Sequence, residues 1–172
     1  FLFHKVEKGG FLMRKWILIL SVFLFVGCQG KIGSFIDGDA NLALVFDKIQ
    51  KEIIDEGNSL VLWNDVPLSA NEIEKLYQLD MTKVEEYLVK TAVVEAQCSE
   101  IAFFKVEKEK ESYVKDAISY RKDTLKNRWG TTVEEASYLL DNALEGRIGA
   151  YYYFVVGSDS EKVVNYIQKM DE

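Results

Sequence analysis

The sequence predicts an α+β fold, in which a small antiparallel or mixed sheet is packed with helices. Two segments, 85–94 and 100–107, alternate in the manner of β-strands, and the short polar stretch between them suits a hairpin. A third apolar segment, 147–156, lies much later in the chain, after two helical patterns. This order of helices and strands, with a hairpin in the middle, indicates the α+β class.

Residues 13–27 have the three-part form of an export signal. Met13 is followed by Arg14 and Lys15, which supply a positive charge, and then by an apolar run of eleven residues, 16–26. A helix that crosses a bilayer needs about 20 apolar residues. The run is therefore too short to span a membrane comfortably, and polar residues follow it at once.

The end of the apolar run, Phe25-Val26-Gly27-Cys28, resembles the lipobox of bacterial lipoproteins. Phe25 stands where that pattern usually has leucine. The resemblance implies that the Cys28 thiol receives a diacylglyceryl group and that a peptidase cuts between Gly27 and Cys28. We therefore expect a lipid anchor on the extracytoplasmic face of the cell membrane. The alternatives are an ordinary membrane anchor, or a cleaved signal with a chance cysteine.

Residues 1–12 need a separate explanation. The chain begins with Phe1, and Lys8-Gly9-Gly10 can be encoded by a ribosome-binding site that lies just before Met13. We expect residues 1–12 to be an upstream segment that is absent from the expressed protein, which any peptide from it in a mass spectrum would refute. His4, the only histidine, lies in this segment.

The expected mature chain is one tethered domain with a strong negative charge. Residues 28–38 form a short tether and residues 39–172 a single domain of ordinary size. Residues 1–27 contain four basic residues and one acidic residue, so 17 basic and 27 acidic residues follow them, a formal charge of −10. This charge argues against nucleic acid as a partner, because such binding needs clustered lysine and arginine. It also argues against a polybasic face on anionic lipid.

Helical periodicity predicts the remaining elements. A first helix is expected at 39–56, an extended piece at 60–63, and a short helix that ends at Tyr77. Later helices are expected at 111–128, from 132 and from 158. Ser69-Ala70-Asn71-Glu72, Thr132-Val133-Glu134-Glu135 and Ser158-Asp159-Ser160-Glu161 read as helix caps. The segment 147–156 is apolar on both alternating faces, which predicts one interior strand covered on both sides.

Several of these segments resemble one family. The matching stretches are 77–80, 84–87, 100–106, the helix with Arg121, and the closing strand with 158–163. Together they are similar to the small Gram-positive lipoproteins grouped as domain of unknown function forty-three fifty-eight. The resemblance extends over most of residues 42–168. It implies a fold and a location in the cell envelope, and it carries no catalytic residues.

Cys98 and an acidic stretch near the tether are weak candidates for chemistry. Cys98 is the only thiol left once Cys28 is lipidated, so no disulfide is expected within the chain. With no histidine beside it after residue 12, a structural role is favoured over a reactive one. The stretch 37–41 resembles the start of a calcium loop, but Leu42 and Lys48 occupy positions that need glycine and glutamate. We expect no metal and no cofactor.

Two arginines and two tyrosines are the candidates for ligand binding. Arg121 and Arg147 flank apolar positions and are expected either to pair with carboxylates at the edge of the core or to bind an anionic ligand. Tyr151 and Tyr153 face one way in the expected strand and Tyr152 the other, which suits either core packing or a recognition patch. Adjacent acidic pairs such as Glu85-Glu86 diverge on a strand or helix, so they are expected to be solvated surface.

These observations favour a non-enzymatic envelope lipoprotein that binds a protein or a small ligand. A hydrolase that uses carboxylates with tyrosine or arginine is the alternative, and two acidic groups that converge in a deep cleft would favour it. A purely structural envelope component is a third interpretation.

Overall fold

The computed structural model describes residues 42–55, 63–64 and 66–171. The signal, the lipobox with Gly27 and Cys28, the tether and the calcium-like stretch at 37–41 all lie outside the described residues. So do the first residues of the helix expected at 39–56 and most of the extended piece expected at 60–63.

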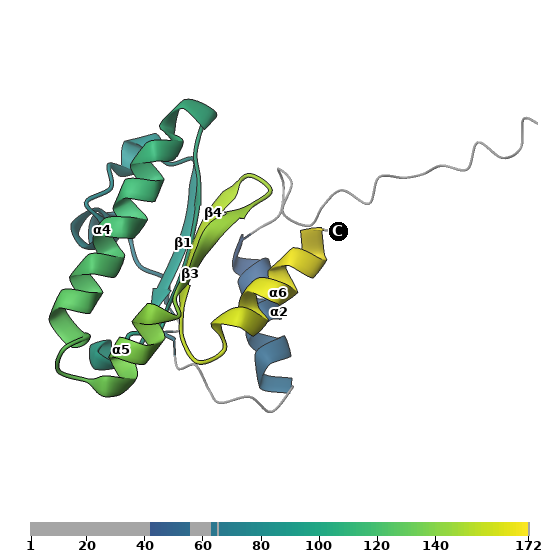
Figure 1. The fold of residues 1–172 in the computed structure, drawn as a ribbon. Coiled ribbons are helices and arrows are strands. Elements are labelled where there is room, and N and C mark those ends of the chain that lie inside the picture. The colour runs from purple at the N-terminus through teal and green to yellow at the C-terminus, as the bar shows by residue number, and fades with distance from the viewer. Residues whose placement is uncertain (1–41, 56–62, 65, 172) are drawn as a thin grey trace, which may run out of the picture. The chain divides into compact units, whose positions relative to one another are not determined.

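A four-stranded antiparallel sheet organises the domain, and the α+β prediction is confirmed (Figure 1). Its strands are β1 (Glu86–Thr91), β2 (Glu100–Lys105), β3 (Leu144–Ile148) and β4 (Tyr151–Val156), in the spatial order β1-β2-β4-β3. The expected hairpin at 85–94 and 100–107 forms with somewhat shorter strands, and Glu86 lies opposite Lys105 in its register. β4 is an interior strand, and each of its residues is buried.

The prediction of a single strand at 147–156 is wrong. Gly149 and Ala150 form a two-residue turn that separates β3 from β4, and the two strands pair antiparallel with Ile148 opposite Tyr151. Gly149 has a φ of 55°, and glycine at the first position of a two-residue hairpin turn is typical of type II′. The apolar pattern continues through this turn, so the alternation alone does not reveal it.

One face of the sheet is covered by α3 (Ala70–Tyr77), α4 (Glu111–Trp129) and α5 (Glu134–Asp141), as Figure 1 shows for α4 and α5. The helical spacing of the apolar residues in α4 turns one side of this helix toward the sheet. The fully or nearly fully buried residues of this layer include Ile73, Tyr77, Val89, Ala102, Phe104, Val114, Leu125, Leu140, Phe154 and Val156.

The opposite face is covered by α2 (Leu42–Asp55) and α6 (Ser160–Asp171). Their apolar residues pack on the strand residues that point the other way, among them Leu88, Ile101, Phe103, Tyr151, Tyr153 and Val155. Phe46 of α2 packs on Trp63, with 5.3 Å between the ring centroids. Trp63, the last residue of the expected extended piece, also forms an isolated bridge with Ala92, which directly follows β1.

The helix caps follow the predictions in part. Glu72 accepts hydrogen bonds from the backbone N–H of Ser69 (2.7 Å) and from its hydroxyl (2.6 Å), which confirms a capping box at the start of α3. The capping box expected at Thr132 is wrong: α5 starts at Glu134, and the Thr132 hydroxyl donates to the Trp129 carbonyl at the end of α4. Because the Thr132 hydroxyl is bonded within the turn that ends α4, it does not cap α5.

Short 3-10 helices complete the domain at η1 (Met81–Lys83), η2 (Glu95–Gln97) and η3 (Lys108–Lys110). The last one directly precedes α4. Within the described part of the chain, none of the helices is both long enough and apolar enough to cross a membrane.

Candidate functional site

A cavity of about 430 Å³ lies between α4 and the hairpin of β3 and β4. Its lining residues are Glu111, Lys115, Ile118 and Ser119 from α4, Glu145, Gly146 and Arg147 from β3, and Tyr152 from β4. Four of these eight residues carry a charge, which distinguishes the cavity from the apolar layers on either side of the sheet. A cavity of this volume is in the range of small-molecule sites.

The local structure of each element explains why these side chains meet. Glu111, Lys115 and Ser119 recur at intervals of four along α4 and therefore lie on one side of the helix. Glu145 and Arg147 are two residues apart in β3, so their side chains project from the same face of the sheet. Antiparallel register then sets Arg147 directly opposite Tyr152 of β4.

Arg147 and Glu111 form the ion pair that joins the two sides of the cavity. Arg147 Nη1 lies 3.2 Å from Glu111 Oε1, and Arg147 Nε donates to the Gly149 carbonyl at 2.9 Å. Lys115 Nζ lies 3.9 Å from the other oxygen of Glu111. A hydrogen bond from Tyr152 lowers the pKa of Glu111. Burial opposes this shift, and the nearby charges of Arg147 and Lys115 lower the pKa further. Glu111 is therefore held in its ionised form.

Tyr152 forms the aromatic wall of the cavity. Its hydroxyl donates to Glu111. Burial raises the pKa of this phenol most, and the contact with Glu111 raises it further. The Lys115 ammonium and the Arg147 guanidinium lie 5.5 Å and 5.7 Å from the ring centroid. Cations at such distances are attracted by the face of the ring. Two cations and one aromatic ring thus line the same cavity.

Glu145 is the second carboxylate of the cavity. It pairs with Lys122 Nζ at 3.5 Å, so each of the two glutamates that line the cavity has a cationic partner. Acid–base catalysis by two carboxylates requires environments that drive their pKa values apart, with one group kept protonated. A lowered pKa at Glu111 is the opposite of what a general acid needs.

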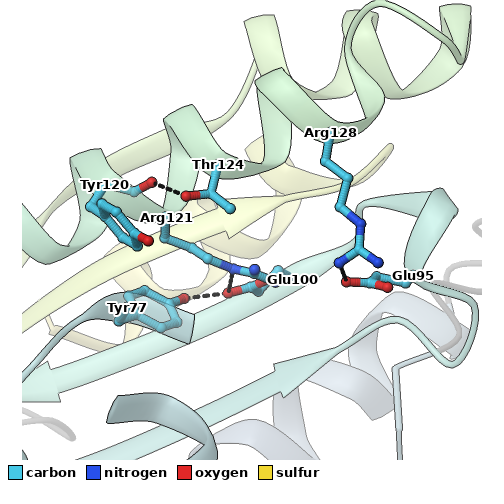
Figure 2. A network of polar contacts seen from close by, with 7 residues as sticks. All are labelled: Tyr77, Glu95, Glu100, Tyr120, Arg121, Thr124 and Arg128. Carbon is cyan, nitrogen blue, oxygen red and sulfur yellow. Dashed lines mark hydrogen bonds and ion pairs between the residues drawn. The ribbon is translucent and has the colours of Figure 1, made fainter. Parts of the chain in front are cut away.

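Arg121, another candidate from the sequence, is buried elsewhere on the same face of the sheet (Figure 2). Arg121 Nη2 and Nε donate to Glu100 Oε2 at 2.6 Å and 3.1 Å, and the Tyr77 hydroxyl donates to Glu100 Oε1. The three residues come from α4, β2 and α3 and are all almost inaccessible to solvent. Of the two alternatives expected for the arginines, pairing with a carboxylate is the one found: Arg121 pairs with Glu100 and Arg147 with Glu111.

Tyr151 and Tyr153 lie on the other face of the sheet, against α2 and α6. Tyr151 donates to Glu86 Oε2 at 2.5 Å, and the Tyr153 ring packs over Gly146. The four binding candidates therefore do not converge on one place. Of these four, the cavity contains Arg147.

Sequence reasoning missed Tyr152, Glu111, Lys115, Ser119 and Glu145 as members of a site. One signal for Glu111, Lys115 and Ser119 was present, namely their spacing of four in a helix. The signal for Tyr152 was its position in a run of three tyrosines, where it faces away from its neighbours. The pairing of β3 with β4, which joins these residues, required the turn at Gly149.

Cys98 has the structural character that the sequence favoured. It is buried at the end of η2 with a φ of 53°, and burial raises the pKa of its thiol to about 11. A thiol in this state forms little thiolate at neutral pH. Among the described residues, no three histidine, cysteine, aspartate or glutamate side chains are grouped so that they could hold a metal ion.

Comparison with known proteins defines a family for this fold. No curated protein and no solved structure matches the chain. The family model described as Domain of unknown function (DUF4358) matches residues 58–157. This range contains all four strands, the buried Tyr77–Glu100–Arg121 network and the whole lining of the cavity. It also spans more than half of the sequence, and the chain therefore belongs to the DUF4358 family, as its resemblance to that family predicted.

Proposed function

We propose that this protein is a lipid-anchored binding protein of the bacterial cell envelope, and that it holds a small charged ligand in the cavity between α4 and β3. The observation that carries the proposed binding role is the composition of this cavity. Arg147, Lys115, Glu111 and Glu145 present charges of both signs beside the ring of Tyr152. Such a lining is complementary to a zwitterion, or to an anion that displaces Glu111 from Arg147.

The anchor rests on the sequence. The positive residues, the short apolar run, Gly27 and Cys28 fall in the order that a lipoprotein signal requires. Two or more acyl chains on Cys28 suffice for stable attachment to a membrane. The resemblance to small Gram-positive lipoproteins supports the extracytoplasmic face of the cell membrane as the location.

Binding is favoured over hydrolysis by the state of the two glutamates. Glu111 accepts from Tyr152 and pairs with Arg147, and Glu145 pairs with Lys122. The contacts of Glu111 lower its pKa and stabilise its ionised form, so this group is not prepared to donate a proton. The cations of these ion pairs remain partly exposed. A ligand can replace a glutamate as the partner of a cation at little cost, because exposed ion pairs contribute only about 0–1 kcal/mol.

The anchor is tested with Cys28→Ala in the native gene. Cells grown with labelled palmitate are expected to incorporate label into the wild-type protein and none into the variant, which should remain an uncleaved precursor. Labelling that persists in Cys28→Ala would refute the anchor and would leave the cavity proposal unaffected.

The cavity is tested by titration calorimetry of the full chain in detergent against the common amino acids, citrate and inorganic phosphate. At least one of these probes is expected to bind the wild-type chain and to lose at least tenfold in affinity in Arg147→Gln and Tyr152→Leu. Arg128→Gln is the matched control, because Arg128 is an exposed α4 arginine that pairs with Glu95 outside the cavity lining. Equal loss in all three variants, or hydrolysis of a bound ester or glycoside probe, would contradict the proposal.

A further inference from the structure

β3 is an outer strand of the sheet, and the described part of the chain leaves its outer edge unpaired. The other outer strand, β1, receives backbone hydrogen bonds from outside the sheet: Asn64 N–H donates to the Thr91 carbonyl (2.9 Å) and Leu68 N–H to the Val89 carbonyl (2.8 Å). No comparable bond to residues 144–148 comes from the described segments. Edge strands with free backbone groups are templates for pairing with another strand.

The turn between β3 and β4 decides which residues present their backbone at this edge. A two-residue hairpin closes on a hydrogen-bonded pair, here Ile148 with Tyr151. Backbone direction alternates along a strand, so Gly146 also directs its N–H and C=O toward β4. Glu145 and Arg147 consequently direct theirs outward.

The sequence of β3, Leu-Glu-Gly-Arg-Ile, is complementary to itself in antiparallel register. A two-fold axis at Gly146 sets Leu144 opposite Ile148 of a second copy and Glu145 opposite its Arg147. The same register makes both Glu145–Arg147 pairs the hydrogen-bonded type, in which each pair exchanges two backbone bonds. The outward backbone groups and the opposite charges therefore coincide at the same two positions.

Gly146 fits the position on the axis. The two central residues form the close, non-hydrogen-bonded type of pair, with about 4.5 Å between their Cα atoms. Glycine within a strand is typical of places where another backbone approaches closely. Glu145 and Arg147 are 46% and 54% exposed at their side chains, so both are accessible to a second copy.

We propose that β3 pairs antiparallel with β3 of a second copy of this chain, so that two four-stranded sheets join into one across a two-fold axis at Gly146. The occupant of the edge is a second copy because the charge order of β3 is complementary to itself in this arrangement: Glu145 meets Arg147 twice. Since Gly146 and Arg147 also line the cavity, the second copy borders the site of the proposed ligand. Pairing at the edge does not depend on that ligand.

The test uses charge reversal at the two positions, with the full chain in detergent and its mass measured by light scattering corrected for bound detergent. The wild-type chain is expected to show twice the mass of one chain. In a pair of Glu145→Arg chains, the new arginine lies opposite Arg147 of the second copy. In a pair of Arg147→Glu chains, the new glutamate lies opposite Glu145 of the second copy. Each variant alone is therefore expected at the mass of one chain.

An equal mixture of the two variants is expected to recover the twofold mass. The arginine introduced at 145 in one chain then faces the glutamate introduced at 147 in the other, while the contacts with Lys122 and Glu111 inside each chain stay broken. Circular dichroism first checks that each variant is folded, and its mass is then measured by light scattering. A wild-type chain of single mass, single variants that still dimerise, or a mixture that stays at single mass would each overturn the proposal, the first of them leaving the edge to a strand from another protein.

Discussion

Arg121 of α4 holds the carboxylate of Glu100 on β2 at 2.6 Å, in a place where both side chains are at most 5% exposed. The guanidinium contacts both carboxylate oxygens through Nε and Nη2, and the Tyr77 hydroxyl completes the set (Figure 2). This network connects α3, β2 and α4 on one face of the sheet. A buried ion pair adds little to stability as a whole, but the loss of one partner leaves an uncompensated charge.

Arg121→Met is therefore expected to lower the free energy of unfolding by about 3–5 kcal/mol. The double variant with Glu100→Gln should lose clearly less, because a neutral amide remains and its carbonyl still accepts from Tyr77. Arg128→Met, at an exposed pair on the same helix, should change stability by about 0–1 kcal/mol. Urea unfolding measures all three. A double variant no more stable than Arg121→Met would show that the buried charge is not the cause.

Tyr77→Phe removes a donor to a charged acceptor and is expected to cost about 1.5–3 kcal/mol. Burial and the neighbouring Glu100 raise the pKa of Tyr77 well above its ordinary value of 10.0. The unfolded chain therefore ionises first, and this residue reduces stability as the pH rises above about 10. Urea unfolding across the alkaline range should show a smaller decline in Tyr77→Phe than in the exposed control Tyr138→Phe. Parallel curves would contradict the role of Tyr77.

Gly146→Ala is expected to destabilise the domain by about 1–3 kcal/mol, a typical cost of overpacking. A Cβ atom at this position would lie 2.6 Å from the Tyr153 hydroxyl oxygen and 2.8 Å from Cζ, the ring carbon that carries it. With Tyr153→Leu as the background, the same change should become nearly neutral. A double-mutant cycle measured by thermal unfolding gives this coupling, and additive effects would refute a direct clash.

Cys98 is expected to resist thiol reagents in the folded protein. Burial raises the pKa of its thiol from 9.0 to about 11, so at pH 8 the thiolate is scarce and inaccessible. In a Cys28→Ala background, labelling with a chromogenic disulfide should be slow in buffer and fast in urea. Rapid labelling of the folded chain would show an exposed or activated thiol.

The raised pKa of Cys98 also predicts that the free energy of unfolding declines in mild alkali. The unfolded chain ionises Cys98 near pH 9 and the folded chain near pH 11, so the unfolded state gains stability between these values. Urea unfolding of Cys98→Ala should show a smaller loss over this interval than the wild-type chain. An equal loss in both proteins would assign the decline to other groups.

Contacts between residues close in sequence were sufficient to predict much of the fold. The alternation in 85–94 and 100–107 predicts the hairpin, and the Ser69–Glu72 pattern predicts the start of α3, because both depend on contacts between residues close in sequence. The pairing of Arg121 with a carboxylate was one of two alternatives expected, since a cation among apolar neighbours requires a partner. Its identity as Glu100, 21 positions away, was not readable from spacing.

Tertiary structure decided the candidate site. The apolar run before Val156 looks like one strand because Ile148, Gly149 and Ala150 lead into the tyrosines without a polar break. Only the pairing of Ile148 with Tyr151 reveals two strands. The sequence by itself determined the α+β class and the capping of α3, while the lipoprotein signal that starts at Met13 stays a prediction. The meeting of Glu111 with Arg147, 36 positions apart, was decided by packing α4 on the sheet, because long-range contacts leave no periodic signal in the chain.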